Sequence, residues 1–457
     1  MSSIRIERDS MGELEVPEEA LYRAQTQRAI NNFPISGQAM PENFIRALLN
    51  AKAAAALANK KLGVVSDAHA DAIVKAADQL LISSDLMKHF PVDVFQTGSG
   101  TSSNMNANEV LATIASKLCG EEVSPNDHVN YGQSSNDIIP STIHISAAVS
   151  LHEELIPALD YLASITRIKA EQVHEHVKTG RTHLMDAMPV RMSQSLNSWA
   201  TQIEQNIAQL KAQQIQLQSL AQGGTAVGTG INAHPEFADT FAKELSARLD
   251  IKFTPAENFF AHIGSQDIAV ALSGQLKTTA VSLLKIANDL RWMNSGPLAG
   301  LGEIELEALQ PGSSIMPGKV NPVIPEATAM VAAQVIGNDA AITVAGQSGN
   351  FELNVMLPLV AQNLLQSLTL LSNSSRLLAD KAISSFKVND AKLQEALSRN
   401  PILVTALNPI IGYLKAADIA KQAYKEGRPV IDVAEENTDL SREELLDLLD
   451  PAKLTLA

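Results

Sequence analysis

Two long stretches of this chain repeat their apolar side chains at alternating intervals of three and four residues. This spacing draws one apolar stripe along a helix of 3.6 residues per turn and leaves the other faces polar. The positions on the two stripes are Met192, Leu196, Trp199, Ile203, Ile207 and Leu210, and then Leu272, Leu276, Thr279, Leu283, Ile286, Leu290 and Met293. The pattern predicts long amphipathic helices with the apolar seam of a helix bundle.

Further helices are predicted over residues 46–62, 143–177, 331–344 and 357–378. A helix of about thirty residues is about 45 Å long, so a single small domain is too narrow to cover it. We therefore expect these helices to pack against further copies of the chain. Aromatic residues make up only 4% of the sequence, so the core must consist of Leu, Ile, Val, Ala and Met. The expected fold is all-α, in three domains, with a central long-helix bundle that oligomerises.

Turn-rich segments on both sides of the predicted bundle mark the domain boundaries. Short helical segments alternate with Gly/Ser/Asn-rich turns before the bundle, and turn signals such as Asn400-Pro401 return after it. We expect an N-terminal, mostly helical domain over 1–136, a central long-helix bundle over 137–390, and a small C-terminal helical domain over 391–457.

The charge balance limits the classes of partner. Thirty-five Lys and Arg against 50 Asp and Glu give a formal net charge of −15, which argues against nucleic-acid binding. An anionic substrate must then be captured by local groups. The single cysteine, Cys119, excludes a disulfide framework and fits a reducing cytosol. With no apolar secretion signal at the N-terminus and no run of eighteen apolar residues, we expect a cytoplasmic protein without a membrane span.

Residues 312–322, GSSIMPGKVNP, combine glycines, prolines, two hydroxyls, an ammonium group and an amide. Glycine and proline fix an irregular backbone, and such loops often carry chemistry. A phosphate-binding loop is excluded, because five residues separate Gly312 from Gly318 and Val320 stands where a magnesium-binding hydroxyl is needed. No strand pattern precedes the loop either. Its polar groups instead suit a small carboxylate.

Three further polar clusters interrupt the predicted helices, at residues 97–106, 133–137 and 180–186. Like the loop 312–322, each offers hydroxyls, amides and backbone N–H groups, which are neutral donors for carboxylate oxygens. Each cluster alone is typical of turns and helix caps. Together, with a lysine and a histidine among them, they indicate a site for a small anion.

His183 is the candidate acid–base group in the cluster 180–186, because histidine titrates near neutral pH. A single histidine is nevertheless more often a surface or core residue. No metal or cofactor is expected, since His174 and His176 fall on different sides of a helix. The glycine-rich run 223–230 follows a predicted helix and not a strand, so we interpret it as a helix-to-loop junction.

These clusters, in this order, resemble the motifs of the fumarase/aspartase superfamily, and within it most closely those of the class II fumarate hydratases. The resemblance covers nearly the whole chain. The matching segments are MGELEVPEEALYRAQTQRAINNF, TGSGTSSNMNANEV, QSSND, GRTHL, GGTAVGTG, GSSIMPGKVNP, SGNFELNV and ALNPIIGYLKAADIAKQAYKEG. It implies an all-α homotetramer whose active sites each draw on three subunits. It also implies reversible, stereospecific hydration of fumarate to L-malate in the tricarboxylic acid cycle, without a metal or other cofactor.

The resemblance also implies a role for each matching residue. Ser313 would be the base that removes the C3 proton, with its alkoxide stabilised by loop N–H groups. Lys319 and Asn321 would bind a substrate carboxylate and stabilise the aci-carboxylate that develops. His183 would activate or deliver the water, oriented by Glu326. The side chains that would hold the dicarboxylate are Ser99, Thr101, Ser134, Ser135, Asn136, Thr182 and Ser314.

Two alternatives to a fumarate hydratase remain within this resemblance. Aspartate ammonia-lyases typically carry glutamine at the position of His183 and alanine at that of Gly318, whereas residues 323–326 look more like an aspartase. We give His183 more weight, because it bears on the chemistry of water. A non-catalytic structural homologue, of the kind recruited as lens crystallin, would be expected to lack Ser313 or His183, and both are present.

One position departs from the class II pattern. Ser124 stands before Pro125, Asn126 and Asp127 where these enzymes usually carry histidine. In the family this segment forms an accessory dicarboxylate site outside the catalytic centre. Because serine removes the imidazole, we expect the accessory site at Ser124, Asn126 and Asp127 to be weak or absent.

Overall fold

Helices built from Ala- and Leu-rich segments make up most of the computed structural model, which describes residues 3–455. The outermost residues of the expected terminal domains, 1–2 and 456–457, lie outside the described residues. The chain divides into two compact units. The first holds the described residues up to Pro157, Ala208–Ala280 and Ala333–Ser372, and the second holds Ala158–Ile207, Val281–Ala332 and the described residues from Asn373 onward.

The first unit is a cluster of helices around the Ala-rich α2, which packs against α3, α5 and α8. Its helices and helical turns are α1 (Ala24–Asn32), α2 (Glu42–Lys61), α3 (Asp67–Leu81), η1 (Leu86–His89), α4 (Thr101–Cys119), η2 (Pro125–Val129), α5 (Ser135–Ser150), η3 (Leu151–Leu155), α8 (Phe237–Leu249) and α9 (Phe259–Gly264). Capping residues fix several of these ends. Ser66 accepts the N–H of His69 at the start of α3, and Gly120 ends α4 at φ +75°.

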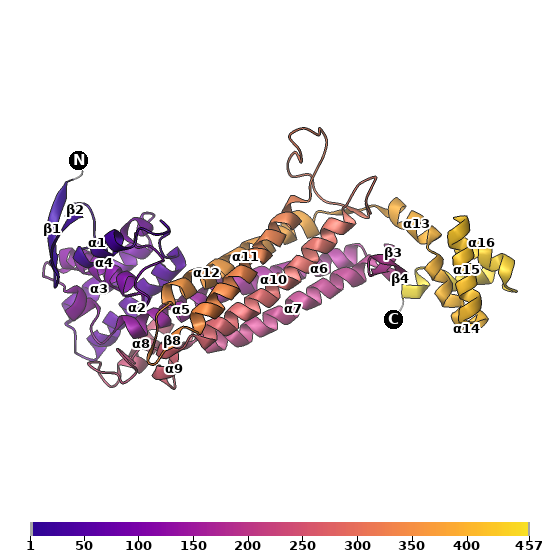
Figure 1. Ribbon diagram of the computed structural model, residues 1–457. Coiled ribbons are helices and arrows are strands. Elements are labelled where there is room, and N and C mark those ends of the chain that lie inside the picture. Colours follow the sequence, from indigo (N-terminus) through magenta and orange to yellow (C-terminus); the bar gives the residue numbers. More distant parts are fainter. Residues whose placement is uncertain (1–2, 456–457) are drawn as a thin grey trace. The chain divides into compact units, whose positions relative to one another are not determined.

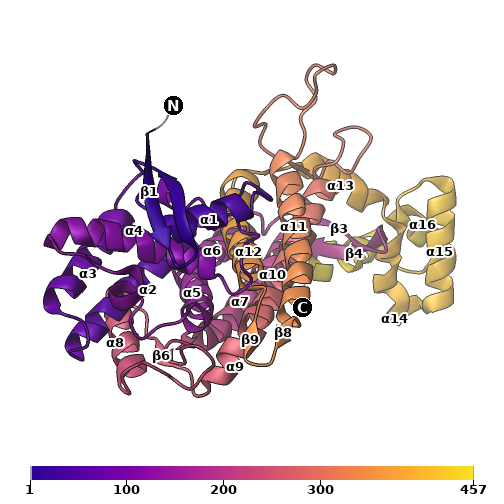
Figure 2. The ribbon, with the colours of Figure 1, turned by 60° about the vertical axis from the view of Figure 1, so that its left-hand side comes forward.

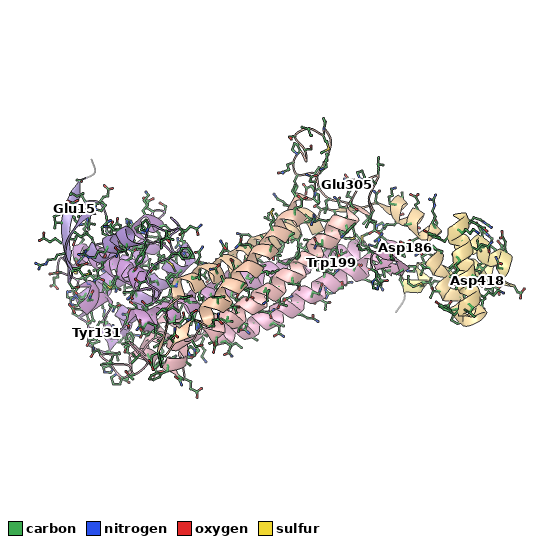
Figure 3. All side chains as sticks on the ribbon, viewed as in Figure 1. Glu15, Tyr131, Asp186, Trp199, Glu305 and Asp418 are labelled. Atoms are coloured by element: carbon green, nitrogen blue, oxygen red, sulfur yellow. The ribbon has the colours of Figure 1, made fainter. Side chains whose placement is uncertain are left out.

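Four long helices, drawn in magenta to orange in Figure 1, pass from one unit to the other: α7 (Met192–Leu217), α10 (Asp267–Met293), α11 (Val323–Gly346) and α12 (Leu357–Leu378). The apolar stripes of α7 and α10 are buried at every position named above. Trp199, labelled on α7 in Figure 3, is 1% exposed. The prediction of long amphipathic helices is confirmed.

The remaining helices belong to the second unit. They are α6 (Ile156–Gln172), which begins at the boundary, η4 (Ala379–Ile383), α13 (Asp390–Arg399), η5 (Pro401–Leu407), α14 (Asn408–Ile411), α15 (Tyr413–Glu426), α16 (Val430–Asn437), α17 (Arg442–Leu448) and η6 (Lys453–Thr455). Figure 2 shows α14, α15 and α16 side by side. They enclose a small core that includes Leu403, Leu407, Ile419, Val433 and Leu445.

The strands are short and pair in twos. The antiparallel pairs are β1 (Ile4–Asp9) with β2 (Gly12–Pro17), β3 (Val177–Thr182) with β4 (Met185–Arg191), β7 (Ile304–Glu305) with β10 (Lys387–Val388), and β8 (Gly349–Asn350) with β9 (Leu353–Asn354); β5 (Ser219–Leu220) and β6 (Thr254–Pro255) are parallel. The all-α prediction is confirmed. The helix expected over 143–177 was too long, because α6 ends at Gln172 and Val177 already pairs with Arg191 in the β3–β4 hairpin.

Among the described helices, α11 alone is long and apolar enough by composition to cross a membrane, and 33% of its apolar window is buried. One such helix is weak evidence for a membrane span, since core helices of soluble proteins pass the same test. Its outward-facing apolar side chains include Met330, Ile336 and Val344, which are 69%, 38% and 54% exposed. The helix therefore leaves an apolar surface that its own chain does not cover.

Candidate functional site

The loop 312–322 belongs to the second unit and lies in the irregular stretch between α10 and α11 (Figure 1). Its two ends are tied together, because Gly312 donates its N–H to the carbonyl of Lys319 at 2.8 Å. Asn321 Nδ2 also donates to the carbonyl of Gly312 at 2.7 Å. A Cβ atom on Gly312 would lie 2.5 Å from the Lys319 carbonyl oxygen. This close approach is why the first position of the loop is glycine.

Ser313 Oγ accepts backbone N–H groups from Met316 at 3.0 Å and from Ile315 at 3.3 Å. Two donors aimed at one hydroxyl oxygen favour negative charge on that oxygen, as in an oxyanion hole. Lys319 Nζ donates to Asn321 Oδ1 at 2.9 Å, so the cation and the amide of the loop lie together. The loop can therefore support a serine alkoxide and also present an ammonium and amide pair to a carboxylate.

A cavity of about 880 Å³ opens beside this loop in the second unit. Lys319, Asn321 and Glu326 line it, whereas Ser313 and Ser314 are not among its lining residues. Sequence reasoning missed Arg291, a second cation in the wall of this cavity. Arg291 lies in the last turn of α10, a position that the helical pattern alone marks as a favourable C-terminal charge.

Thr182 and His183 lie at the tip of the β3–β4 hairpin, whose β4 side carries Asp186, labelled in Figure 3. His183 has φ +55°, a left-handed conformation that histidine adopts more readily than bulky residues do. Its side chain is exposed, and the structure shows no hydrogen bond between it and Glu326 within residues 3–455. Within the described part of one chain, the predicted pair of His183 and Glu326 is therefore not hydrogen-bonded.

A buried ion triad joins strand β3 of this hairpin to Glu303. Glu303, which is 3% exposed, accepts Lys178 Nζ at 2.6 Å on one carboxylate oxygen and Arg181 Nη2 at 2.6 Å on the other. Burial lowers the pKa of Lys178 below its usual value, although the Glu303 carboxylate opposes the shift. Glu303 directly precedes β7 and holds two cations of β3, so it connects the hairpin to the chain that leads into the loop 312–322.

In the first unit, Ser99 and Thr101 lie together at the start of α4, with their hydroxyl oxygens 2.8 Å apart. Gly98 precedes them where the backbone passes close to residue 355: a Cβ on Gly98 would lie 1.8 Å from the Val355 carbonyl oxygen. The Gly98 carbonyl also accepts the N–H of Leu357. Glycine is required here because any side chain would push these two segments apart.

The cluster 133–137 forms the N-terminus of α5. Ser134 and Asp137 make a capping box, in which the Ser134 hydroxyl accepts from the first turn and Asp137 accepts the Ser134 N–H. Asp137 also accepts from Gln222 Nε2 and from the backbone N–H groups of Gly223 and Thr225. Burial raises the pKa of Asp137 to about 6, against these hydrogen bonds. The carboxylate thus fastens the cluster to the glycine-rich run 223–230.

A second cavity, of about 350 Å³, opens over this cluster. Ser134 and Ser135 line it, whereas Asn136 is turned away and donates its amide to the carbonyl of Ala226 at 2.8 Å. Asn104 and Gln133 from the predicted polar clusters line it too, whereas sequence reasoning missed Asn130, Thr225 and Asn232. The sequence signal for Thr225 was the glycine-rich run 223–230, for which the sequence predicts a helix-to-loop junction. Backbone N–H groups of this run bind Asp137, and Thr225, at φ +53°, lines the cavity.

In the predicted accessory segment, residues 124–128 form hydrogen bonds with one another. Ser124 Oγ accepts the N–H of Asp127 at 3.0 Å and donates to the Asp127 carboxylate at 3.0 Å. Its backbone N–H donates to His128 Nδ1 at 2.9 Å. The Ser124 hydroxyl and the Asp127 carboxylate therefore already bind each other. Among residues 3–455, no group of three or more His, Cys, Asp or Glu side chains is arranged to hold a metal ion.

Comparison with known proteins identifies the family. The family model described as "Lyase" matches residues 12–337, and the one described as "Fumarase C C-terminus" matches residues 403–456. The chain is 72% identical to the fumarate hydratase class II 2 of Pseudomonas aeruginosa over 100% of this chain and 99% of that protein. It is 59% identical to the class II fumarate hydratase of Xylella fastidiosa, over 99% and 95% of the two chains.

A solved structure gives the same answer for the fold. The crystal structure of recombinant class II fumarase from Schistosoma mansoni matches with a TM-score of 0.96 and 38% sequence identity, covering 99% of both chains. The motifs, the helical architecture and these whole-length matches agree with one another. The chain belongs to the class II fumarate hydratase family.

Proposed function

We propose that this protein is a hydro-lyase, a class II fumarate hydratase that catalyses the reversible, stereospecific hydration of fumarate to L-malate in the tricarboxylic acid cycle. The observation that carries the proposal is the hydroxyl of Ser313, which receives two backbone N–H donors in a loop that also holds Lys319 beside Asn321. This is the arrangement required for a serine base next to a carboxylate anchor. The chemistry needs no metal and no organic cofactor.

In the direction of malate dehydration, the Ser313 alkoxide takes the proton from C3. The electron pair of the C3–H bond moves toward the adjacent carboxylate and forms an aci-carboxylate, which Lys319 and Asn321 stabilise. The C2–O bond then breaks as the double bond forms, and the hydroxyl leaves as water with a proton delivered from His183. The N–H groups of Ile315 and Met316 support this role, because they lower the cost of the Ser313 anion.

The remaining site residues hold the substrate. The side chains that we assign to the dicarboxylate are Ser99, Thr101, Ser134, Ser135, Asn136, Thr182 and Ser314. Supporting this assignment, Ser134 and Ser135 line a cavity together with the amide side chains of Asn104, Asn130, Gln133 and Asn232, which are neutral hydrogen-bond donors. Ser124, Asn126 and Asp127 form at most a weak accessory site, because the Ser124 hydroxyl already occupies the Asp127 carboxylate.

We further infer a cytoplasmic homotetramer in which each active site draws on three subunits. Two observations support it. His183 and Glu326 have complementary roles but share no hydrogen bond within the described chain, as expected if a partner subunit completes the pair. The exposed apolar side chains of α11, such as Met330 and Val344, need a partner surface. In this arrangement residues 137–390 form the shared core, between the domains 1–136 and 391–457.

The test is a substrate comparison with the purified protein. L-malate and L-aspartate are supplied separately, and fumarate formation is followed by its ultraviolet absorbance. The proposal expects fumarate from L-malate alone. Fumarate from L-aspartate with release of ammonia, and none from L-malate, would identify an aspartate ammonia-lyase. Turnover of neither substrate would favour a non-catalytic homologue.

A further inference from the structure

Lys52 is a buried ammonium group in the middle of the Ala-rich helix α2. Its side chain has no exposed surface. Its Nζ atom donates to Gln133 Oε1 at 2.8 Å and to Asn130 Oδ1 at 3.0 Å. Asn130 lies in the turn before the cluster 133–137, and Gln133 is the first residue of that cluster. Lys52 therefore fixes, through these two hydrogen bonds, the segment that carries Ser134 and Ser135.

Hydrogen bonds lead from Lys52 to the wall of the 350 Å³ cavity. Asn130 Oδ1, which accepts from Lys52, also accepts from Asn104 Nδ2 at 3.2 Å. Asn104 Nδ2 in turn lies 3.0 Å from Ser135 Oγ, to which it donates. Asn130, Gln133, Asn104 and Ser135 all line the cavity. One layer of amides thus separates the buried charge from any ligand there.

No charged side chain lines this cavity within residues 3–455. A carboxylate bound there would meet only neutral donors, in a chain whose net charge is −15. A buried cation behind those donors supplies the missing attraction, because a charge acts strongly through a low-dielectric interior. Thr225, which lines the cavity, also has a buried hydroxyl with no hydrogen-bond partner among the described residues.

Asp137 is the one charged group that acts on Lys52 among the described residues. Helix α4 and the turn 130–133 present amides, and α5 presents the Asp137 carboxylate. That carboxylate is already held by the N–H groups of residues 134, 223 and 225 and by the Gln222 amide. Burial lowers the pKa of Lys52 to about 7, and Asp137 opposes the shift only in part. Burial of Lys52 thus disfavours the positive charge of its ammonium group.

A purely structural role does not require an ammonium group. A glutamine at position 52 could donate to one of the same amide oxygens without the desolvation of a charge. Local choices that oppose stability are typical of functional sites. The charge itself is therefore the feature that needs a function.

We propose that Lys52 is a positioning residue for the dicarboxylate, fixing Asn130 and Gln133 beneath Ser134 and Ser135 and placing a positive charge behind the pocket for one substrate carboxylate. This inference rests on the proposed function, since it assigns the cavity to fumarate and L-malate. Lys52 touches neither reacting carbon. Its loss should therefore weaken binding far more than it slows the chemical step.

The experiment compares full-length wild type with Lys52→Gln and Lys52→Met, and uses Lys60→Gln as a matched control. Lys60 lies on the same helix but pairs with Asp71 outside this network. KM and kcat for L-malate are measured, together with the affinity for succinate, a non-reacting dicarboxylate, by calorimetry. We expect both Lys52 variants to raise KM and the succinate Kd on the order of tenfold, the effect of one charge a few ångströms behind the ligand. Their kcat should change by less than about threefold, and Lys60→Gln should match wild type.

Proton linkage provides an independent readout. Lys52 loses its proton as the pH rises past about 7, and a bound dianion favours the protonated form. Succinate binding to wild type between pH 7.5 and 9 should therefore take up protons, detected as a dependence of the binding enthalpy on the buffer. Lys52→Gln should lack this uptake. This range lies above that in which histidine ordinarily titrates.

The outcomes separate the two proposals. A wild type that does not turn over L-malate overturns the proposed function. A wild type that does, together with a Lys52→Gln variant of unchanged KM, overturns the role of Lys52. If neither Lys52 variant assembles, calorimetry on the wild type tests the role of Lys52. Succinate binding without proton uptake would then overturn that role.

Discussion

Replacement of Glu303 should strongly destabilise the second unit, because Glu303 is a buried carboxylate held by two cations. Glu303→Gln retains the size of the side chain but removes the only carboxylate that the structure shows bonded to both Lys178 and Arg181, each at 2.6 Å. The amide can accept from one cation, while its NH₂ group faces the other. The perturbation therefore removes a charge and leaves the packing nearly unchanged.

The magnitude follows from the burial of the three side chains. Lys178 is 8% exposed at its side chain and Glu303 is 5% exposed, whereas Arg181 is 19% exposed and can turn partly to water. Removing one partner of a buried pair costs about 3–5 kcal/mol, because the other charge remains desolvated. Burial already lowers the pKa of Lys178, so loss of the neighbouring anion drives it further toward the neutral form. Because a neutral Lys178 no longer has a desolvated charge, its neutralisation limits the stability that Glu303→Gln can cost. We therefore expect the free energy of unfolding to fall by about 3 kcal/mol.

The assay is urea unfolding at one fixed protein concentration, because the stability of an oligomer depends on concentration. Glu305→Gln serves as the control for stability, since Glu305 is exposed two residues further along (Figure 3) and should change it by less than about 0.5 kcal/mol. The double variant Glu303→Met with Lys178→Met removes both charges and should recover most of the loss. A Glu303→Gln protein within about 1 kcal/mol of wild type, or a double variant no more stable than the single one, would refute this reasoning.

Three further predictions concern the site and the N-terminal hairpin. Ser313→Ala should lower kcat at least about a hundredfold with the oligomer intact by light scattering, and near-normal turnover would exclude Ser313 as the base. Ser124→His should allow a second L-malate to bind near Asn126 in a soaked crystal, whereas clear occupancy in wild type would contradict a weak accessory site. The hydrogen bond from Arg28 and then those from the turn N–H groups lower the pKa of Asp9, although desolvation opposes them. The Asp9 carboxylate therefore contributes to stability above about pH 4, and this contribution is lost as the pH falls through the lowered pKa. Asp9→Asn should therefore flatten the acid side of the unfolding midpoint plotted against pH, and an unchanged slope would count against the ion pair.

Local rules were sufficient where one segment determines its own structure. The apolar stripe from Met192 predicted α7, because a three-and-four spacing can be buried along one face of a helix only. At the start of α17, Ser441 and Glu444 form a capping box, which two residues three positions apart make within one segment. The same approach failed at residue 177. There the pairing of Val177 with Arg191 overrode the helical pattern, and no local signal records a partner strand further along the chain.

The sequence by itself determined the fold class and the family, because periodic apolar residues and ordered motifs are properties of the chain alone. It also marked Ser313, Lys319 and His183 as candidate site residues, since their loops are rich in glycine, proline and small polar residues. Only the tertiary structure decided that Ile315 and Met316 direct their N–H groups at the Ser313 hydroxyl. It alone placed Lys52 beneath Gln133, 81 positions apart in the chain. Burial and hydrogen bonding between distant segments arise only on packing, so a lysine in an alanine-rich helix gives no sign in the sequence that it is enclosed.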